Sequence, residues 1–240
     1  MRSLWLGCTD YYDAWDLQRE LAALHATEDI EDYLLLLEHP PTITLGRGAN
    51  RSNLLESLEK LTEFGISVYD VDRGGDVTYH GPGQLVGYPV FNLNRHKRDL
   101  HWFLRQMEQC LIQVLSKYSI EAKRFPPHTG VWVEDRKIAA MGIKVSRWVT
   151  THGFALNVAT EPADFVHIVP CGIRDYAVTS IHLETRPIRT VVEVACDTAK
   201  SFATTFQAPN DIDDSWAVPS LSEKSRKILS SAIDIGKSRC

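Results

Sequence analysis

Residues 73–88, RGGDVTYHGPGQLVGY, hold five of the chain's fourteen glycines. Gly74-Gly75 and Gly81-x-Gly83 allow positive φ and a close approach of the backbone to another surface, and the proline between Gly81 and Gly83 restricts the turn. Residues 77–80 and 84–90 favour extended structure on either side of that turn. The segment therefore predicts a strand, a glycine loop and a second strand.

Polar side chains surround these glycines. A glycine-rich hairpin with a packed histidine would explain the glycines alone, but Arg73, Thr78, His80 and Gln84 together favour a binding site. No Gly-Lys-Ser/Thr follows, and no G-x-G-x-x-G opens a helix, so the segment is neither a P-loop nor a dinucleotide fingerprint.

The same segment closely resembles the signature of the lipoyl(octanoyl) transferase family, R-G-G-x-x-T-(aromatic)-H-x-x-G-Q-x-(aliphatic)-x-Y, at every fixed position through Tyr88. A related glycine-rich segment marks biotin and lipoate protein ligases, so the signature indicates a superfamily more firmly than a reaction. Residues 38–47, EHPPTITLGR, are similar to the family's N-terminal segment. The resemblance implies one α/β (α+β) domain of the biotin/lipoate protein ligase type, with a mixed β-sheet flanked by helices.

Composition bounds the class of protein. The length of 240 residues and the hydrophobic content of 44% suit a single domain with a full core. The net charge of −5 gives no global basic field for nucleic acid. The chain opens without a signal peptide, and its longest apolar run, residues 33–37, is too short for a membrane span. We expect a cytoplasmic monomer that binds neither nucleic acid nor membranes; an organelle protein that has lost its transit peptide would look the same.

The five cysteines are odd in number and contain no C-x-x-C pair. This argues against a disulfide framework and against a structural zinc site, and it favours a reducing compartment. A zinc site built from His80, His152, His167 and Cys171 lacks any recognised ligand spacing. We expect no metal and no cofactor.

Periodicity and turn residues predict the elements along the chain. Helices are expected at 12–25, 53–64, 99–118 and 190–206, and strands at 33–37, 42–45, 67–71, 130–133, 137–145, 154–158 and 177–183. Residues 161–174 are expected to form an irregular loop. The catalytic domain is expected at 1–206, and residues 207–240 are expected to be a C-terminal extension that is not a separate domain, with Cys240 an idle thiol.

Cys171 lies in the segment His167-Ile-Val-Pro-Cys-Gly-Ile173, between a proline and a glycine. A loop can present a side chain there, although a lone cysteine is more often an inert small hydrophobe. The phrase IVPCGI resembles the family's segment around its acyl-thioester cysteine. The resemblance therefore implies that Cys171 is the nucleophile.

A thiol needs a base or a cation beside it to become a nucleophile. Lys137 and Lys144 lie seven residues apart on one expected strand, so in an unbulged strand at most one can point at Cys171; a bulge at Gly142 would reverse that parity. The family's base is the lysine of K-I-(A/G)-(A/S)-x-G, which the resemblance places at Lys137 in KIAAMG. By residue type alone, His80, His152 or His167 could serve instead.

The family's substrate contacts map onto three segments, of which His152-Gly153-Phe154-Ala155 matches H-G-(L/F)-A. They imply an acyl tunnel walled by Arg73, Gly74, Gly75, Asp76, Val77, Thr78, Tyr79, His80, Ala140, Met141, Gly142, Gly153, Phe154 and Ala155. Backbone N–H groups near the glycines would form the oxyanion hole.

The reaction implied by the resemblance is ping-pong transfer of an octanoyl or lipoyl group from acyl carrier protein to a lysine ε-amine of a lipoate-dependent protein, such as a lipoyl domain of a 2-oxoacid dehydrogenase or the glycine cleavage H protein. Arg47, Arg51 and Arg147 are candidates for a local basic patch that docks the acidic carrier. An ATP-dependent lipoate or biotin protein ligase of the same fold and a non-catalytic binding module are the alternatives.

Overall fold

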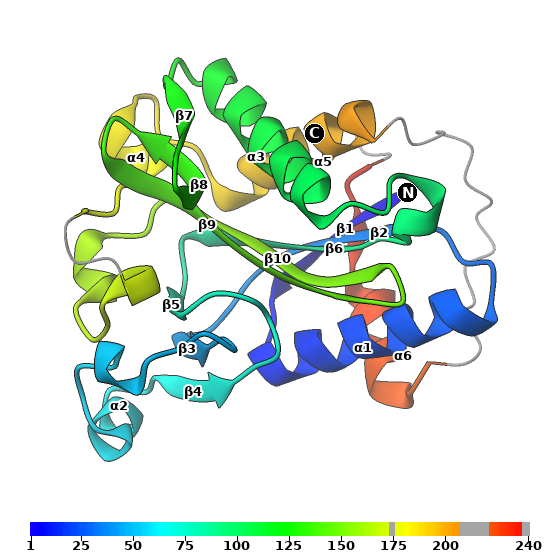
Figure 1. Ribbon diagram of the computed structural model, residues 1–240, viewed down its shortest axis with the longest axis horizontal. Helices are drawn as coiled ribbons and strands as arrows, with labels where there is room; N and C mark the ends of the chain where they lie inside the picture. Colours follow the sequence, from blue (N-terminus) through cyan, green and yellow to red (C-terminus); the bar gives the residue numbers. More distant parts are fainter. Residues whose placement is uncertain (173–175, 207–220, 237–240) are drawn as a thin grey trace.

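The computed structural model describes residues 1–172, 176–206 and 221–236. An eight-stranded sheet runs through the molecule in the order β11-β1-β2-β6-β10-β9-β8-β7, and a three-stranded sheet, β4-β3-β5, lies beside it (Figure 1). In the large sheet only the β1–β2 pair is parallel. The fold is therefore a mixed α/β domain, as expected.

The strands of the large sheet are β1 (Arg2–Cys8), β2 (Tyr33–Glu38), β6 (Gln84–Val90), β7 (Ala122–Phe125), β8 (His128–Val133), β9 (Arg136–Ser146), β10 (Val149–Asn157) and β11 (Ile233–Asp234). Those of the small sheet are β3 (Thr42–Leu45), β4 (Ser67–Asp70) and β5 (Val77–His80). The glycine loop at 81–83 thus carries the chain from one sheet to the other, because β5 pairs with β3 whereas β6 pairs with β2 and β10.

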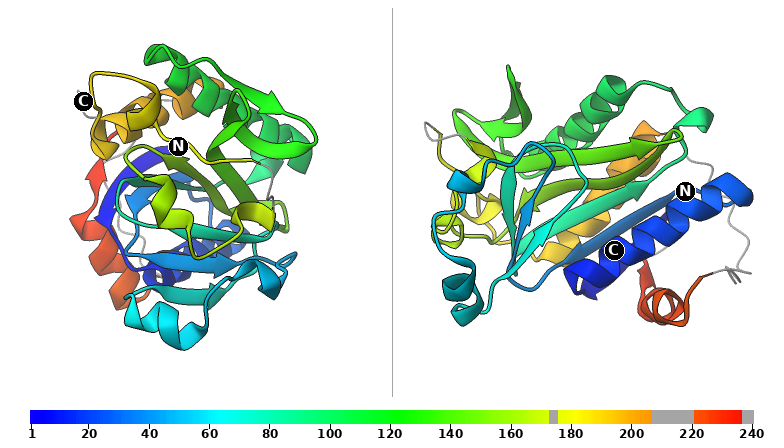
Figure 2. Two further views of the ribbon diagram at one scale, coloured as in Figure 1. Left: turned by 90° about the vertical axis from the view of Figure 1, so that its left-hand side faces the viewer. Right: turned by 60° about the horizontal axis from the view of Figure 1, so that its bottom comes forward.

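The helices are α1 (Tyr11–Thr27), α2 (Leu58–Glu63), α3 (Leu100–Lys117), α4 (Ile181–Glu184), α5 (Val191–Thr205) and α6 (Glu223–Ser231). Short 3-10 turns, η1 to η4, occupy Arg51–Asn53, Leu93–Arg95, Pro162–Phe165 and Pro170–Gly172. Helices α3 and α5 cover one face of the large sheet, and α1 with α6 covers the other (Figures 1 and 2).

Caps and periodic apolar residues explain the long helices. Asp10 accepts hydrogen bonds from the first backbone N–H groups of α1, and Thr190 forms a capping box with Glu193 at the start of α5. Apolar residues of α3 and α5 recur every three or four positions and bury a common core, which includes Phe103, Phe202 and Phe206. Helices α3 and α5 therefore cover the face of the large sheet opposite to the face that α1 covers.

Several expected elements differ. The helix expected at 53–64 is only η1 and α2, because Leu54 instead forms a bridge with Ile168. The strand expected at 177–183 is a single bridge at Val178 followed by α4. Strands β1 and β7 were not predicted.

The C-terminal extension packs onto the domain where the structure describes it. Leu221 and Leu229 are buried in the core beneath α1, and β11 pairs with β1 and forms one edge of the large sheet. Cys8, Cys110 and Cys171 are free thiols. Cys240 lies outside the described residues. None of the described helices is long and apolar enough to cross a membrane.

Candidate active site

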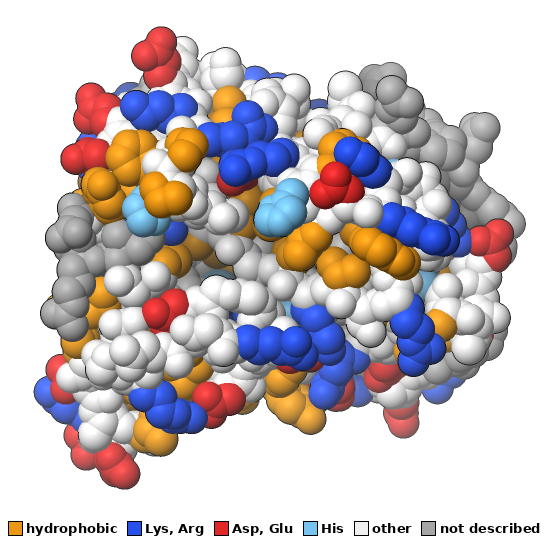
Figure 3. Space-filling view, in the orientation of Figure 1, with side chains coloured by type: hydrophobic (Ala, Val, Ile, Leu, Met, Phe, Trp, Pro, Cys, Tyr) orange, Lys and Arg blue, Asp and Glu red, His pale blue; other side chains and the backbone are white. Residues whose placement is uncertain are grey.

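A cavity of about 430 Å³ lies between the two sheets and the start of α3. Its walls come from residues 73–78 and His80, from β9 and β10, from the β7–β8 turn and from Leu100 and Leu104 of α3. The space-filling view shows this face hollowed near its centre (Figure 3). Apolar side chains and backbone supply much of the wall, so the cavity suits a hydrocarbon chain.

The segment 73–75 packs closely against β9 and against Gly46, which explains why glycines occupy positions 142 and 46. The backbone N–H of Gly74 donates to the carbonyl of Ile143 at 3.0 Å. A Cβ at Gly142 would lie 2.6 Å from the Gly74 carbonyl oxygen, and one at Gly46 would lie 2.4 Å from the carbonyl oxygen of Gly75. Both positions therefore exclude any larger residue unless the segment moves.

Arg73 is buried beneath this segment. Its guanidinium donates to the carbonyl and hydroxyl oxygens of Thr44, at 2.9 Å each, and to the Gly74 carbonyl at 3.0 Å. Burial lowers the pKa of Arg73. The side chain is thus a fixed positive charge at the cavity wall, held by neutral acceptors rather than by a salt bridge to a carboxylate of the described residues.

Cys171 and Lys137 both line this cavity. Cys171 has φ 56° and ψ 17°, a left-handed conformation that is uncommon for a residue with a side chain. Lys137 is only 7% exposed, and its Nζ lies 4.9 Å from the centroid of the Trp132 ring. A thiol and an amine therefore line the same cavity.

The backbone of Lys137 is fixed by the segment that follows the cysteine. Its N–H donates to the Ala177 carbonyl, and its carbonyl accepts from the Thr179 N–H, each at 2.9 Å. The Thr179 carbonyl in turn accepts from Asn157 Nδ2 at 2.9 Å, and Gln84 Nε2 donates to Asn157 Oδ1 at 3.0 Å. This chain of hydrogen bonds links the glycine loop to the lysine.

Only Lys137 of the two lysines on β9 lines the cavity, but the alternation expected of an unbulged strand does not explain this. The pairing of β8 with β9 passes from Val131↔Ala139 to Trp132↔Lys137, so Ile138 is an extra residue in β9. Such a bulge reverses the alternation of side chains. What separates the two lysines is their distance along the strand. Lys144 Nζ binds Asp72 Oδ2 at 2.5 Å, and neither Lys144 nor Asp72 lines the cavity.

The three candidate histidines are otherwise engaged. His80 is fully enclosed, its Nδ1 is 2.8 Å from Gln84 Oε1, and burial holds the pKa of His80 well below its usual range. His152 Nε2 is 2.7 Å from Asp72 Oδ1, and burial lowers the pKa of His152. His167 stacks on Phe64 and does not line the cavity. Within residues 1–172, 176–206 and 221–236, no three His, Cys, Asp or Glu side chains could hold a metal ion.

Thirteen of the fourteen expected substrate contacts line the cavity. The exception is Tyr79, whose ring packs against Phe165 in the core of the small sheet. Alternation along β5 explains this, because Thr78 and His80 face the cavity and Tyr79 faces the other way. Sequence reasoning did not place Tyr11, Leu100 or Leu104 here, since their helices reach the cavity only through tertiary packing.

Comparisons with known proteins point to one family. A family model described as the lipoyl protein ligase A/B catalytic domain matches residues 10–203. An octanoyltransferase of Solibacter usitatus is 54% identical over 70% of this chain and 76% of its own length. Another, from Nostoc punctiforme, is 48% identical over 83% of this chain and 86% of its own. A lipoate protein ligase A solved with bound ATP superposes with a TM-score of 0.73 at 16% identity, covering 95% and 92% of the two chains, which shows the fold alone.

Proposed function

The chain belongs to the lipoyl protein ligase A/B catalytic family and, within it, to the octanoyltransferases, and from that premise we propose that Cys171 carries the octanoyl group while Lys137 acts as the base. The reaction is octanoyl transfer in protein lipoylation. The observation that carries the assignment of residues is the presence of both side chains in one largely apolar cavity.

The first half-reaction forms the acyl-enzyme. The Cys171 sulfur attacks the carbonyl carbon of an octanoyl thioester, the bond to the donor sulfur breaks, and the donor leaves as a thiol after taking one proton. In this proposal Lys137 accepts the proton of Cys171 and returns it to the leaving thiol. One thioester replaces another, so this exchange needs no nucleotide.

The second half-reaction forms the amide. The ε-amine of the acceptor lysine attacks the Cys171 thioester, the C–S bond breaks, and Lys137 takes the proton that the amine loses. Lys137 Nζ lies 4.9 Å from the centroid of the Trp132 ring, so the aromatic face can contact the ammonium group that this step produces.

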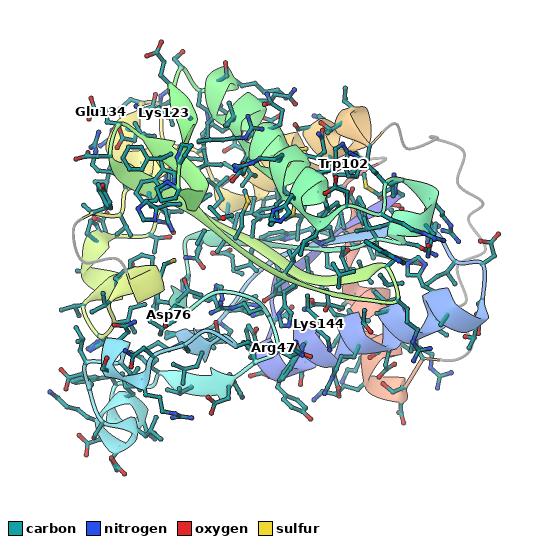
Figure 4. The ribbon with its side chains drawn as sticks, viewed as in Figure 1. Arg47, Asp76, Trp102, Lys123, Glu134 and Lys144 are labelled. Atoms are coloured by element: carbon teal, nitrogen blue, oxygen red, sulfur yellow. The ribbon has the colours of Figure 1, made fainter. Side chains whose placement is uncertain are left out.

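We propose acyl carrier protein as the donor and a lipoyl domain as the acceptor. Arg47, which Figure 4 labels, lies next to a residue of the cavity wall, because its backbone N–H donates to the Arg73 carbonyl at 3.0 Å; no salt bridge joins it to another described side chain. Arg105 follows the cavity-lining Leu104 on α3. Arg105 and Arg124 share the buried Glu108 carboxylate, at 2.6 and 2.8 Å, which leaves one net positive charge on this side of the cavity. Such a rim fits an acidic donor on an otherwise acidic chain. Of the other arginines expected in this patch, Arg51 is paired with Asp70 at 2.7 Å.

The ligase alternative is not favoured. Its support is a shared fold at 16% identity, whereas the octanoyltransferase relatives are 48–54% identical. A ligase would need nucleotide and would release pyrophosphate, and it would remain active without Cys171.

The deciding experiment mixes purified protein with octanoyl-acyl carrier protein in the absence of nucleotide. Intact-protein mass spectrometry should show one octanoyl adduct, which peptide mapping should place on Cys171. Cys171→Ala should show none and should transfer nothing to a lipoyl domain. Activity of Cys171→Ala that depends on ATP would instead establish the ligase.

A further inference from the structure

The segment that carries Cys171 is held along one side by residues 50–55. The Leu55 N–H donates to the His167 carbonyl at 2.9 Å, and the Val169 N–H donates to the Asn53 carbonyl at 2.8 Å. Leu54 and Ile168 form a bridge between these two bonds. Residues 167–169 are therefore attached to η1 by their backbone.

The next three residues have far less backbone support. Within 170–172 the Gly172 N–H donates to the Val169 carbonyl at 3.0 Å. Cys171 and Gly172 both have positive φ, 56° and 69°. A cysteine held in this conformation costs free energy locally, so neighbouring groups must hold it there.

Two side chains meet over Gly172. Asn53 Nδ2 donates to Asp76 Oδ2 at 2.6 Å. A Cβ at Gly172 would lie 2.6 Å from that oxygen and 3.0 Å from that nitrogen. The hydrogen-bonded pair thus rests on the backbone immediately after the nucleophile, and only a glycine leaves room for it.

The other oxygen of Asp76 is also engaged. Asp76 Oδ1 accepts from the backbone N–H of Val77 at 2.7 Å and from that of Asn50 at 3.1 Å. The carboxylate therefore bridges the start of β5, η1 and the cysteine segment. It does so through hydrogen bonds within the protein, and Asp76 also lines the cavity.

We propose that Asn53 and Asp76 are positioning residues that clamp Gly172 and so aim the Cys171 sulfur into the cavity. This inference rests on the proposed role of Cys171 as nucleophile. Asn53 does not line the cavity, so loss of its hydrogen bond should slow acylation and leave the binding of an acyl chain unchanged.

The test removes the hydrogen bond between Asn53 and Asp76 and then restores it with its direction reversed. Asn53→Asp opposes two carboxylates, and Asn53→Ala removes the donor without adding charge; either should slow acyl-enzyme formation from octanoyl-acyl carrier protein about tenfold or more. The double variant N53D/D76N restores one amide-to-carboxylate hydrogen bond with its direction reversed. It should recover the rate to within about threefold of the wild type. Asp70→Asn, at an exposed salt bridge beside η1, is the matched control and should keep the wild-type rate.

Each outcome has a distinct meaning. Formation of the adduct is followed by rapid quench and mass spectrometry, and the affinity for free octanoate is measured for Asn53→Ala, whose side chain lies outside the cavity lining. Unchanged octanoate affinity with slow acylation supports the clamp, and parallel loss of both overturns it. Wild-type acylation in folded Asn53→Ala, or no recovery in the folded double variant, also overturns it. Should the wild type itself form no adduct, the proposed nucleophile fails rather than the clamp.

Discussion

Lys137 Nζ lies 4.9 Å from the centroid of the Trp132 ring on the paired strand β8, and no salt bridge joins this lysine to a carboxylate of the described residues. The aromatic face is thus the partner that the structure gives to its charge. Lys144, on the same strand, has its charge satisfied by Asp72. The two lysines of β9 are therefore in different chemical settings.

We expect Lys137→Ala to lower the rate of octanoyl transfer by about 10²–10⁴, because the variant lacks the group that exchanges protons with sulfur and amine. Lys144→Ala should retain activity within a few-fold, since its partner Asp72 lies outside the cavity lining. Single-turnover transfer to a lipoyl domain measures both. The opposite ranking would assign the base to Lys144.

A matched pair of glycines tests how segment 73–75 is seated. A Cβ at Gly46 would lie 2.4 Å from the Gly75 carbonyl oxygen and 2.8 Å from Arg73 Nη1, whereas a Cβ at Gly48 would lie 3.4 Å from that same oxygen. We expect Gly46→Ala to displace the segment and weaken octanoate binding about tenfold or more. Gly48→Ala should bind octanoate like the wild type. Equal affinities for the two variants would show that the segment adapts freely.

Most of this arrangement was predictable because it follows from local signals. Asp10, Thr190 and the periodic apolar residues predict the long helices, and the glycines of 73–88 predict a loop at a site. The signature also predicts which residues line the cavity, apart from Tyr79.

What could not be predicted depends on long-range contacts. The sequence KIAAMG gives no sign of the bulge at Ile138. The alternation of side chains expected in an unbulged strand therefore does not apply between Lys137 and Lys144. Leu54 leaves its expected helix because it bridges Ile168, more than a hundred residues away. Asn53 likewise carried no sequence motif, and its relation to Asp76 emerges only when η1 meets β5.

The buried histidines predict how stability depends on pH. Burial lowers the pKa of His39 to about 4, and His39 lies between the Thr9 carbonyl and the Tyr88 hydroxyl, at 2.6 and 2.8 Å. An unfolded histidine binds a proton near pH 6.5, whereas the folded protein leaves His39 neutral until about pH 4. The contribution of His39 to stability is thus complete above pH 6.5 and is lost as pH falls toward 4, by roughly 3 kcal/mol.

Urea unfolding measured at intervals from pH 7 to 4.5 should therefore show a falling free energy of unfolding. The slope should decrease by about one proton in His39→Gln, whatever the absolute stability of that variant. An unchanged slope would mean that His39 titrates alike in both states.

Charge reversal tests the proposed docking rim. Arg47→Glu should raise KM for octanoyl-acyl carrier protein about tenfold at low salt and leave kcat nearly unchanged, because a rim charge acts mainly on encounter. The difference should shrink as the ionic strength increases. Arg226→Glu, which makes the same charge change on α6 at the opposite side of the large sheet, should leave KM unaltered. A similar increase in both variants would attribute the effect to net charge alone.

The described part of the C-terminal extension packs against the domain and should contribute to its stability, which two of its residues can test. Leu229 on α6 is 2% exposed and packs in the core beneath α1, whereas Ile233 at the start of β11 is 58% exposed. Leu229→Ala should lower the free energy of unfolding by about 2–5 kcal/mol through lost burial and a residual cavity. Ile233→Ala removes a side chain of equal size from the surface and should change it by no more than about 0.5 kcal/mol. Urea unfolding decides, and equal effects would mean that α6 does not dock on α1 in solution. The cavity is built from β5, β9 and β10 rather than from α6, so transfer activity of folded Leu229→Ala should match the wild type.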